Sequence, residues 1–243
     1  MPETQRKEPE SEERVGASAI LPPEPEGVIL DMDGLALDTE ATYCQAWQQA
    51  AATLGCPLPE EFCRSLFGHH AEEVRRLVAE FTGNRLDLED FARLASRIWH
   101  DHVAVQGVAR MPGLEALLSF LRARSIPYAL ATNSEARFAD ICLERAGVRR
   151  LFPVIVTRDQ VAHGKPDPDL YLEAARRLGV PPQCCLALED SEAGIEAAHR
   201  SGAFAVLVTP RPNLSEKVRE YARVRFSSLG ELLAALKLGC SRN

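Results

Sequence analysis

The chain has 243 residues, of which 46% are hydrophobic, and a formal net charge of −7 at pH 7. This composition is ordinary for a globular protein and allows either one large domain or a core with a smaller insert. The negative charge argues against nucleic acid and membrane surfaces as partners, since both would need clustered positive charge, and no run of about 20 apolar residues is present to span a bilayer.

Residues 1–26 are rich in Glu, Pro, Arg and Ser and lack the apolar segment of a secretory signal. Such a composition cannot bury apolar surface, so we interpret these residues as a mobile tail. The seven cysteines are odd in number and scattered in apolar surroundings, which is typical of reduced thiols rather than of a disulfide framework. We therefore expect a cytoplasmic protein.

The first predicted strand, residues 27–31, is a short apolar run that ends in a carboxylate. A run without polar alternation is typical of a strand buried on both faces, as in a parallel sheet. From residue 38 to residue 109, apolar residues recur at three- and four-residue intervals, and no convincing strand interrupts them. We interpret residues 38–109 as a helical cap inserted into a core made of residues 27–37 and 110–243.

After residue 110, helix and strand patterns alternate along the chain. The expected strands cover residues 127–131, 153–156, 185–188, 204–208 and a segment near Val224, and the expected helices cover residues 114–124, 138–146, 169–178, 194–201 and 229–238. Repeated units of this spacing favour a parallel sheet with helices on both faces. The predicted fold class is α/β: a Rossmann-like, doubly wound parallel sheet core with an inserted all-helical cap domain.

Polar residues follow four of the predicted strands at their carboxyl ends. They are Asp31 and Asp33; Thr132, Asn133 and Ser134; Arg158 and Asp159; and Glu189 and Asp190, with Lys165 shortly after the third group. Ligands of open parallel sheets bind beyond this edge, so these side chains are candidates for one shared site.

Each acidic or hydroxyl group also has a plainer explanation. Asp31 and Asp33 stand two residues apart before Gly34, which suits either a simple turn or a pair of acids held by a cation such as Mg²⁺. The segments that contain Asp190 and Thr132 precede predicted helices, so both could be helix caps. A hydroxyl and backbone N–H groups at a helix start also suit a phosphate group.

Lys165 gives the most restrictive local signal. It lies in the segment Gly-Lys-Pro-Asp-Pro and is one of only four lysines among the 28 Lys and Arg residues. A lysine offers a compact charge rather than the planar fork of arginine, which suits a position beside a transferring phosphoryl group. The alternative is a solvated loop lysine.

Together these residues describe a phosphoryl-transfer site. Asp31 would attack phosphorus and form an aspartyl-phosphate. Asp33 would protonate the leaving oxygen and then activate water. Magnesium, Lys165 and the region of Thr132 would neutralise charge on the phosphoryl oxygens.

The chain resembles the haloacid dehalogenase-like superfamily, in the branch with beta-phosphoglucomutase and phosphoglycolate phosphatase. The matching motifs are DMDGLALDTE from Asp31, LATNS through Thr132, GKPDP at Lys165 and LEDSEAGIEAA through Asp190. The resemblance covers residues 27–209. It implies that the second acid, Asp33, goes with phosphoryl chemistry, because true dehalogenases lack it.

The resemblance also implies the roles of individual residues. Asp31, Asp33 and Lys165 would be catalytic, and phosphate would be bound by Thr132, Asn133 and Lys165. Magnesium would be held by Asp31, the backbone carbonyl of Asp33, and Asp190, with Glu189 nearby. The cap would close over the core and select the leaving group.

Departures from the family pattern favour hydrolysis over a mutase reaction. Tyr43 stands where mutases carry a histidine, and Gly68-His69-His70-Ala71 replaces a Gly-x-Ser-Arg that would clamp a second phosphate. Arg75 or Arg76 could compensate for that arginine. The cap has no lysine, which argues against the phosphonate-cleaving relatives.

We therefore expect a monomeric Mg²⁺-dependent phosphatase for a small phosphorylated metabolite, either a sugar phosphate or a phosphorylated organic acid. Gly68, His69 and His70 are expected to contact the substrate from the cap. An intramolecular phosphomutase and a binding protein without catalysis remain as alternatives.

Overall fold

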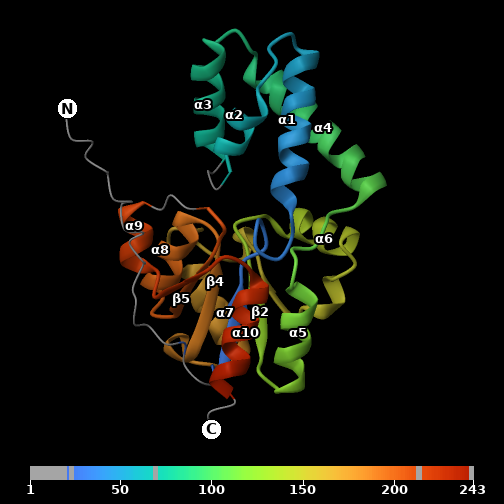
Figure 1. Ribbon diagram of the computed structural model, residues 1–243. Coiled ribbons are helices and arrows are strands. Elements are labelled where there is room, and N and C mark those ends of the chain that lie inside the picture. The colour runs from blue at the N-terminus through green and yellow to red at the C-terminus, as the bar shows by residue number, and fades with distance from the viewer. Residues whose placement is uncertain (1–20, 22–24, 68–70, 212–214, 241–243) are drawn as a thin grey trace, which may run out of the picture.

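The computed structural model describes residues 21, 25–67, 71–211 and 215–240, and Figure 1 shows a sheet with helices on both sides and a helical layer at one end. Most of the tail expected over residues 1–26 lies outside the described residues. Among the helices of the described ranges, none is long and apolar enough to cross a membrane.

The core is a six-stranded sheet in the order β3-β2-β1-β4-β5-β6, with every neighbouring pair parallel. Its strands are β1 Gly27–Leu30, β2 Tyr128–Ala131, β3 Val154–Val156, β4 Cys185–Glu189, β5 Phe204–Val208 and β6 Val224–Phe226. The chain builds outward from β1 to β3, then returns to the other side of β1 with β4. This reversal beside β1 is the switch point at which doubly wound sheets bind ligands, and the predicted fold class is confirmed.

Helices cover both faces of the sheet because its strands are apolar on both sides. In β1, Val28 and Leu30 belong to one core cluster and Ile29 to another. The first cluster includes residues of α5 Leu114–Ala123, α6 Ala136–Arg145 and α10 Leu229–Cys240, and the second includes residues of α7 Asp169–Leu178, α8 Glu192–Arg200 and α9 Glu216–Tyr221. Alternate side chains of one strand thus anchor two opposed helical layers.

In the part of the chain that the structure describes, four helices separate β1 from the rest of the core, and we call them the cap: α1 Thr39–Thr53, α2 Glu60–Ser65, α3 Ala71–Thr82 and α4 Leu88–Gln106. They enclose an apolar cluster of their own, which includes Cys63, Leu66 and Phe91. Figure 1 shows the cap at one end of the sheet core. An all-helical insertion is therefore confirmed, while its limits at 38 and 109 stay a prediction.

The segments that lead into and out of the cap run side by side. Leu37 forms isolated bridges with Asp33 and with Arg110, and the N–H of Met111 donates to the carbonyl of Ala36 at 3.0 Å. These pairings tie both connections to the sheet edge that carries Asp31. A movement of the cap would therefore also move the backbone beside the sheet edge that carries Asp31.

The structure contains short elements that periodicity did not predict. Helix α9 has six residues and is capped at its start by Ser215, whose side chain accepts from the N–H of Val218 at 3.3 Å. The described residues also form short 3₁₀ turns at η1 Arg149–Leu151, η2 Arg158–Gln160 and η3 Pro182–Cys184. Elements this short do not span enough of a period to give a pattern.

Candidate active site

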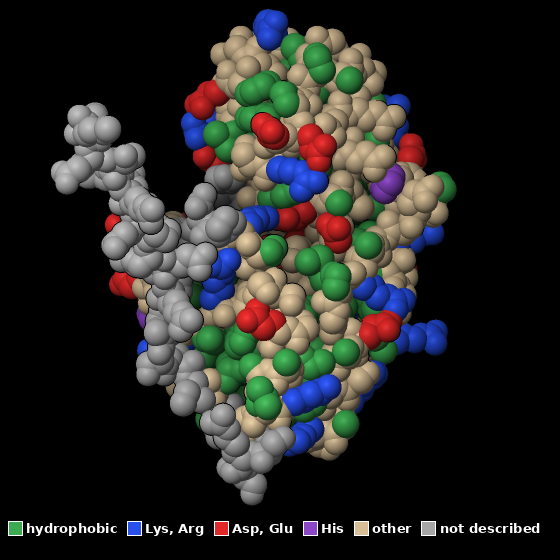
Figure 2. Space-filling view, in the orientation of Figure 1, with side chains coloured by type: hydrophobic (Ala, Val, Ile, Leu, Met, Phe, Trp, Pro, Cys, Tyr) green, Lys and Arg blue, Asp and Glu red, His purple; other side chains and the backbone are tan. Residues whose placement is uncertain are grey.

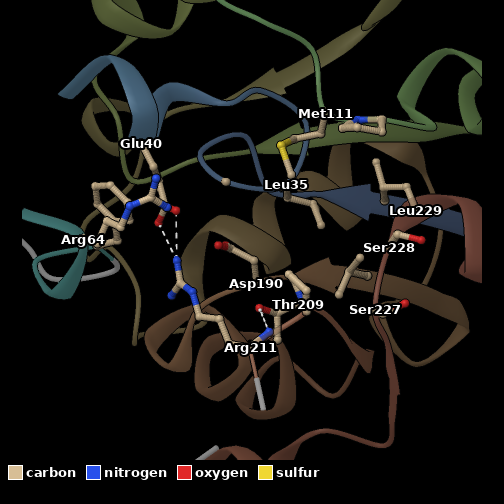
Figure 3. A pocket seen from close by; sticks show the side chains of 15 residues that line it. Leu35, Glu40, Arg64, Met111, Asp190, Thr209, Arg211, Ser227, Ser228 and Leu229 are labelled. Carbon is tan, nitrogen blue, oxygen red and sulfur yellow. Dashed lines mark hydrogen bonds and ion pairs between the residues drawn. The ribbon is translucent and has the colours of Figure 1, made fainter. Parts of the chain in front are cut away.

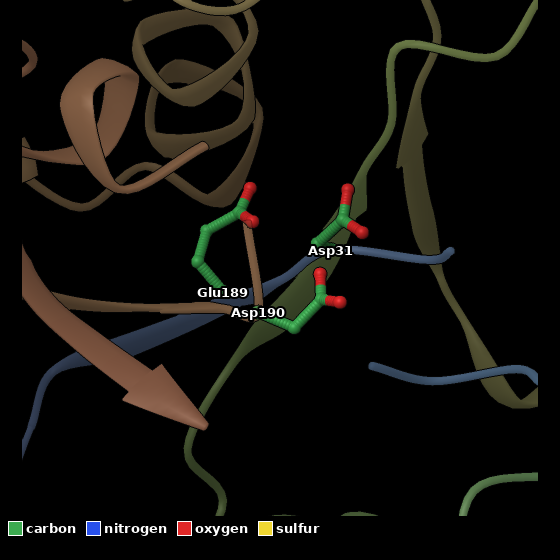
Figure 4. A group of neighbouring side chains, drawn as sticks. All are labelled: Asp31, Glu189 and Asp190. Atoms are coloured by element: carbon green, nitrogen blue, oxygen red, sulfur yellow. The ribbon is translucent and has the colours of Figure 1, made fainter. Parts of the chain in front are cut away.

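The acidic residues meet where β1 and β4 end. Leu30 pairs with Leu188, so Asp31 emerges beside Glu189 and Asp190, and the N–H of Asp31 donates to the carbonyl of Leu188 at 3.0 Å. One carboxylate oxygen from each of the three acids lies within 4.8 Å of the other two. Figure 4 shows the three side chains gathered at this point.

Lys165 reaches into this group and is almost fully buried. Its Nζ donates to Oδ1 of Asp31, to Oε1 of Glu189 at 2.5 Å and to the carbonyl of Ala131 at 3.0 Å, and its side chain is 4% exposed. Burial acts to lower the pKa of Lys165, but the charges of Asp31 and Glu189 outweigh it and raise the pKa above its usual value. A solvated loop lysine is therefore excluded.

Asn133 fixes the loop that carries Lys165. Its Oδ1 accepts from the backbone N–H of Lys165 at 2.8 Å, and its Nδ2 donates to the carbonyl of the same residue at 3.2 Å. Gly164, one residue earlier, has no room for a side chain, because an added Cβ would lie 2.5 Å from Oδ1 of Asn133. Asn133 thus orients the lysine loop, and its predicted role as a phosphate ligand stays a prediction.

Asp33 is held by three hydroxyl groups. One carboxylate oxygen accepts from Thr39 at 2.7 Å, and the other accepts from Thr132 at 3.1 Å and from Ser134 at 3.0 Å. Thr39 belongs to the first turn of α1, so this network links the cap to the ends of β1 and β2. Thr132, proposed from the sequence for phosphate binding, is fully buried in this position.

Glu189 is fully buried, and both of its carboxylate oxygens accept hydrogen bonds. Oε1 accepts from Lys165 and from the hydroxyl of Tyr171, while Oε2 accepts from the hydroxyl of Ser191 at 3.1 Å. Ser191 also accepts from the N–H of Gly194 at 3.1 Å, so the helix-cap interpretation of this segment holds for Ser191. Tyr171 was missed at the sequence level, where it is indistinguishable from an apolar core residue of α7.

Two glycines make room for the acids. At Gly194 an added Cβ would lie 2.0 Å or less from both carboxylate oxygens of Glu189, and at Gly34 it would lie 2.4 Å from Oδ2 of Asp190. Gly34 also has a φ of +78°, which few other residues adopt. The backbone is therefore shaped around the carboxylates on two sides.

Among the described residues, the site gathers more carboxylates than buried cations. Four carboxylates, from Asp31, Asp33, Glu189 and Asp190, face one buried lysine. Burial, opposed by Lys165, raises the pKa of Asp31 to about 8, and burial together with the charges of Asp31 and Glu189 raises the pKa of Asp190 well above its usual value. Clustered hard oxygens with uncompensated charge fit a divalent cation such as Mg²⁺.

A cavity of about 510 Å³ lies beside Asp190, between the cap and the core (Figure 3). Across it, Nη2 of Arg211 from the core donates to both carboxylate oxygens of Glu40 from α1, at 2.9 and 3.0 Å. Arg64 of α2 also lines this cavity. Figure 2 shows charged side chains gathered on this face at the level where the cap meets the core.

The other predicted residues take structural roles or cannot be placed. Asp159 accepts from the hydroxyl of Thr157 at 2.7 Å and from the N–H of Ala136 at 2.9 Å, which ties the end of β3 to the start of α6. Arg75 pairs with Glu89, and Arg76 pairs with Glu73 and Glu80, all within the cap. Gly68, His69 and His70 lie outside the described residues.

Comparison with known proteins agrees with this geometry. The model of the haloacid dehalogenase-like hydrolase family matches residues 28–208. A phosphorylated carbohydrates phosphatase of Thermotoga maritima is 35% identical over 215 residues, covering 87% of this chain and 98% of its own. A beta-phosphoglucomutase of Bacillus subtilis is 33% identical over 192 residues, covering 74% and 81%.

Among solved structures, a haloacid dehalogenase family hydrolase from Deinococcus radiodurans R1, with bound phosphate and sodium, superposes with a TM-score of 0.76. It is 30% identical, and the match covers 91% of this chain and 97% of that one. The sequence match thus extends over the sheet and the cap together. The chain belongs to the haloacid dehalogenase-like hydrolase family.

Proposed function

We propose that the protein is a Mg²⁺-dependent phosphatase that hydrolyses a small phosphomonoester through an aspartyl-phosphate on Asp31. The observation that carries the proposal is the placement of Asp31, between the buried ammonium of Lys165 and the carboxylate of Asp190 at the end of a central strand. A carboxylate in this position has a charge partner on one side and the start of a metal site on the other. A carboxylate nucleophile can approach an anionic phosphoryl group only if cations balance the negative charges of both groups.

Magnesium would be held by Asp31, Asp190 and the backbone carbonyl of Asp33, with Glu189 nearby. When bound, the ion supplies positive charge to the phosphoryl oxygens and to the carboxylate that attacks them. The excess of carboxylates over cations at this edge supports its presence. A bound ion would also lower the pKa of Asp31, so that its carboxylate is ionised at neutral pH.

The chain's own residues would then complete the transfer in two steps. An oxygen of Asp31 forms a bond to phosphorus while the bond to the leaving oxygen breaks, and Asp33 gives that oxygen a proton. In the second step Asp33 takes a proton from water, whose oxygen attacks phosphorus and releases Asp31. The hydroxyls of Thr39, Thr132 and Ser134 fix the carboxylate of Asp33 beside the nucleophile.

The surroundings of Tyr43 support hydrolysis over the mutase reaction. Its ring stacks on those of Trp47, Trp99 and Phe138, with centroids 5.6–5.7 Å apart. Burial foremost, and then the charge of Asp33, raise the pKa of Tyr43 above its usual value, so its hydroxyl stays protonated near neutral pH. The side chain at the position of the mutase histidine is thus a packing residue.

The substrate would be a small phosphorylated metabolite, a sugar phosphate or a phosphorylated organic acid. The name of the Thermotoga maritima relative, a phosphorylated carbohydrates phosphatase, supports the sugar phosphate. We place the enzyme in the cytoplasm as a monomer. Six cysteines, Cys44, Cys56, Cys63, Cys142, Cys184 and Cys185, are free thiols, as expected in a reducing compartment.

Phosphate release from a panel of phosphate esters, with Mg²⁺ and with EDTA, tests the proposal. The comparison needs wild type, Asp31→Asn, and Asp101→Asn, which makes the same charge change at an exposed residue of α4. We expect release by wild type and Asp101→Asn with Mg²⁺ only, and none by Asp31→Asn. Equal release by all three proteins would refute the proposed nucleophile.

The mutase alternative has its own assay. The protein is incubated with a hexose 1-phosphate and a trace of the matching bisphosphate, and both free phosphate and isomerised ester are measured. Free phosphate supports the phosphatase. Isomer without free phosphate would overturn it in favour of the mutase.

A further inference from the structure

Tyr171 is a buried tyrosine whose hydroxyl points at the polar site rather than into the apolar core. It lies in the first turn of α7, shortly after Lys165, and is fully buried. Its hydroxyl donates to Oε1 of Glu189, the same oxygen that accepts from Nζ of Lys165. The lysine ammonium also lies 5.2 Å from the centroid of the Tyr171 ring, within the range of a cation–π contact.

These contacts place Tyr171 behind the charged groups and out of reach of a substrate at the sheet edge. Burial foremost, and then the charge of Glu189, raise the pKa of Tyr171 well above its usual value, so the hydroxyl keeps its proton and stays a donor. Oε2 of Glu189 is held by Ser191 at 3.1 Å. The carboxylate of Glu189 is thus fixed from both sides by donors of the protein.

We propose that Tyr171 is a positioning residue for phosphoryl transfer: its hydroxyl holds Glu189 in the orientation that keeps Lys165 shared between Glu189 and the nucleophile Asp31. The inference rests on the proposed function, since it assigns a role within the same site. Without the hydroxyl, Oε1 of Glu189 keeps Lys165 as a donor but loses Tyr171, so the carboxylate is held less firmly and can turn. Lys165 would then be drawn more fully onto Asp31 and would occupy the electron pair that must attack phosphorus.

The test compares Tyr171→Phe with Tyr128→Phe. Tyr128 is a matched control because it is also buried, at 4% exposed, and its hydroxyl also makes a hydrogen bond, to the carbonyl of Leu151 at 2.7 Å. It lies at the amino end of β2, away from the site. Both changes remove one buried hydroxyl, so an effect specific to Tyr171 does not come from packing alone.

We expect kcat of Tyr171→Phe to fall about tenfold, the size typical of losing a hydrogen bond to a charged group, while KM stays within about twofold. Tyr128→Phe should keep both values. Since Tyr171 acts through Glu189, adding Tyr171→Phe to Glu189→Gln should cost no further activity. A kcat of Tyr171→Phe equal to that of Tyr128→Phe, or independent losses in the double variant, would overturn the inference.

A second readout does not depend on turnover. The chain has four lysines, which can be labelled with ¹⁵N at Nζ alone. The ammonium of Lys165 is buried and has three acceptors, whereas the side chain of Lys217 is 60% exposed. The Nζ resonance of Lys165 should shift, and the Nζ protons of Lys165 should exchange faster, in Tyr171→Phe but not in Tyr128→Phe. An unchanged resonance would contradict the inference.

The two readouts separate the inference from the proposed function. If wild type releases no phosphate from any ester, the proposed function fails and the Lys165 resonance alone decides the role of Tyr171. If wild type is active and Tyr171→Phe matches Tyr128→Phe, the inference fails alone. Should Tyr171→Phe not fold, Tyr171→Met also removes the hydroxyl while filling the space with a flexible side chain, and the same comparison applies.

Discussion

Gly194 lies in the first turn of α8, directly against the carboxylate of Glu189, and its replacement by alanine should damage both stability and activity. An added Cβ would lie 1.9–2.0 Å from the carboxyl carbon and both oxygens of Glu189. The carboxylate can move aside only by leaving Lys165, Tyr171 and Ser191, its hydrogen-bond donors. The clash therefore cannot be relieved by a simple side-chain rotation.

The expected change in the free energy of unfolding follows from two opposed effects. Breaking a buried ion pair such as Lys165–Glu189 costs about 3–5 kcal/mol. Replacing glycine by alanine within a helix returns about 1 kcal/mol of helix propensity. We expect Gly194→Ala to lower the free energy of unfolding by about 2–4 kcal/mol and to reduce kcat strongly, because Lys165 loses one of its two acidic partners.

Gly230→Ala is the matched control. Gly230 lies in the first turn of α10, and the nearest heavy atom to an added Cβ is Oγ of Ser228 at 3.7 Å, an ordinary contact. This change should raise the free energy of unfolding by about 0.5–1 kcal/mol and leave kcat unaltered. Urea denaturation of the three proteins gives the comparison. A Gly194→Ala protein as stable and active as Gly230→Ala would refute the placement of Glu189.

Three further predictions concern the charges of the site. Asp190→Asn should raise the Mg²⁺ concentration needed for half-maximal phosphate release at least tenfold. It should also raise the melting temperature in EDTA, because one of several clustered negative charges is removed. A lower melting temperature in EDTA would contradict this expectation. Burial, opposed by Lys165, raises the pKa of Asp31 to about 8, so in EDTA the folded state binds more protons than the unfolded state between pH ~4 and about 8. The free energy of unfolding should therefore fall as pH rises across this window and level off above it. Urea melts of wild type should show that slope, and Asp31→Asn should flatten it; equal slopes would contradict the pKa assignment. The side chains of the Glu40–Arg211 pair are 22% and 45% exposed. A double-mutant cycle should therefore give a coupling free energy of about 0.5–1 kcal/mol that decreases as salt is added. A coupling free energy that salt leaves unchanged would contradict a solvent-exposed pair.

The sequence predicted the sheet and its polar edge because both are local signals. A buried parallel strand is a short apolar run, and Asp31 and Glu189 mark the ends of two such runs. The order of the strands did not follow from these runs, since nothing in a strand's own residues specifies its neighbours. That β1 and β4 are adjacent, which brings Asp31 to Asp190, required the tertiary structure.

The contacts that orient the acids could not be predicted from the sequence either, because the partners lie far apart along the chain. Tyr171 and Glu189 are 18 positions apart, and Glu40 and Arg211 are 171 positions apart. In α7 the tyrosine lies on the apolar stripe of the helix, where a core role is the ordinary expectation. Only its hydroxyl, which periodicity ignores, connects it to the site.

In the proposed reaction Asp31 carries the phosphoryl group. The most direct test mixes the protein with Mg²⁺ and a hydrolysed ester from the panel, quenches the reaction in acid within milliseconds, and measures the mass of the peptide that contains Asp31. We expect a transient phosphoryl adduct on Asp31 that decays as free phosphate appears, and no adduct in Asp31→Asn. Phosphate release without an adduct, retained in Asp31→Asn, would contradict it.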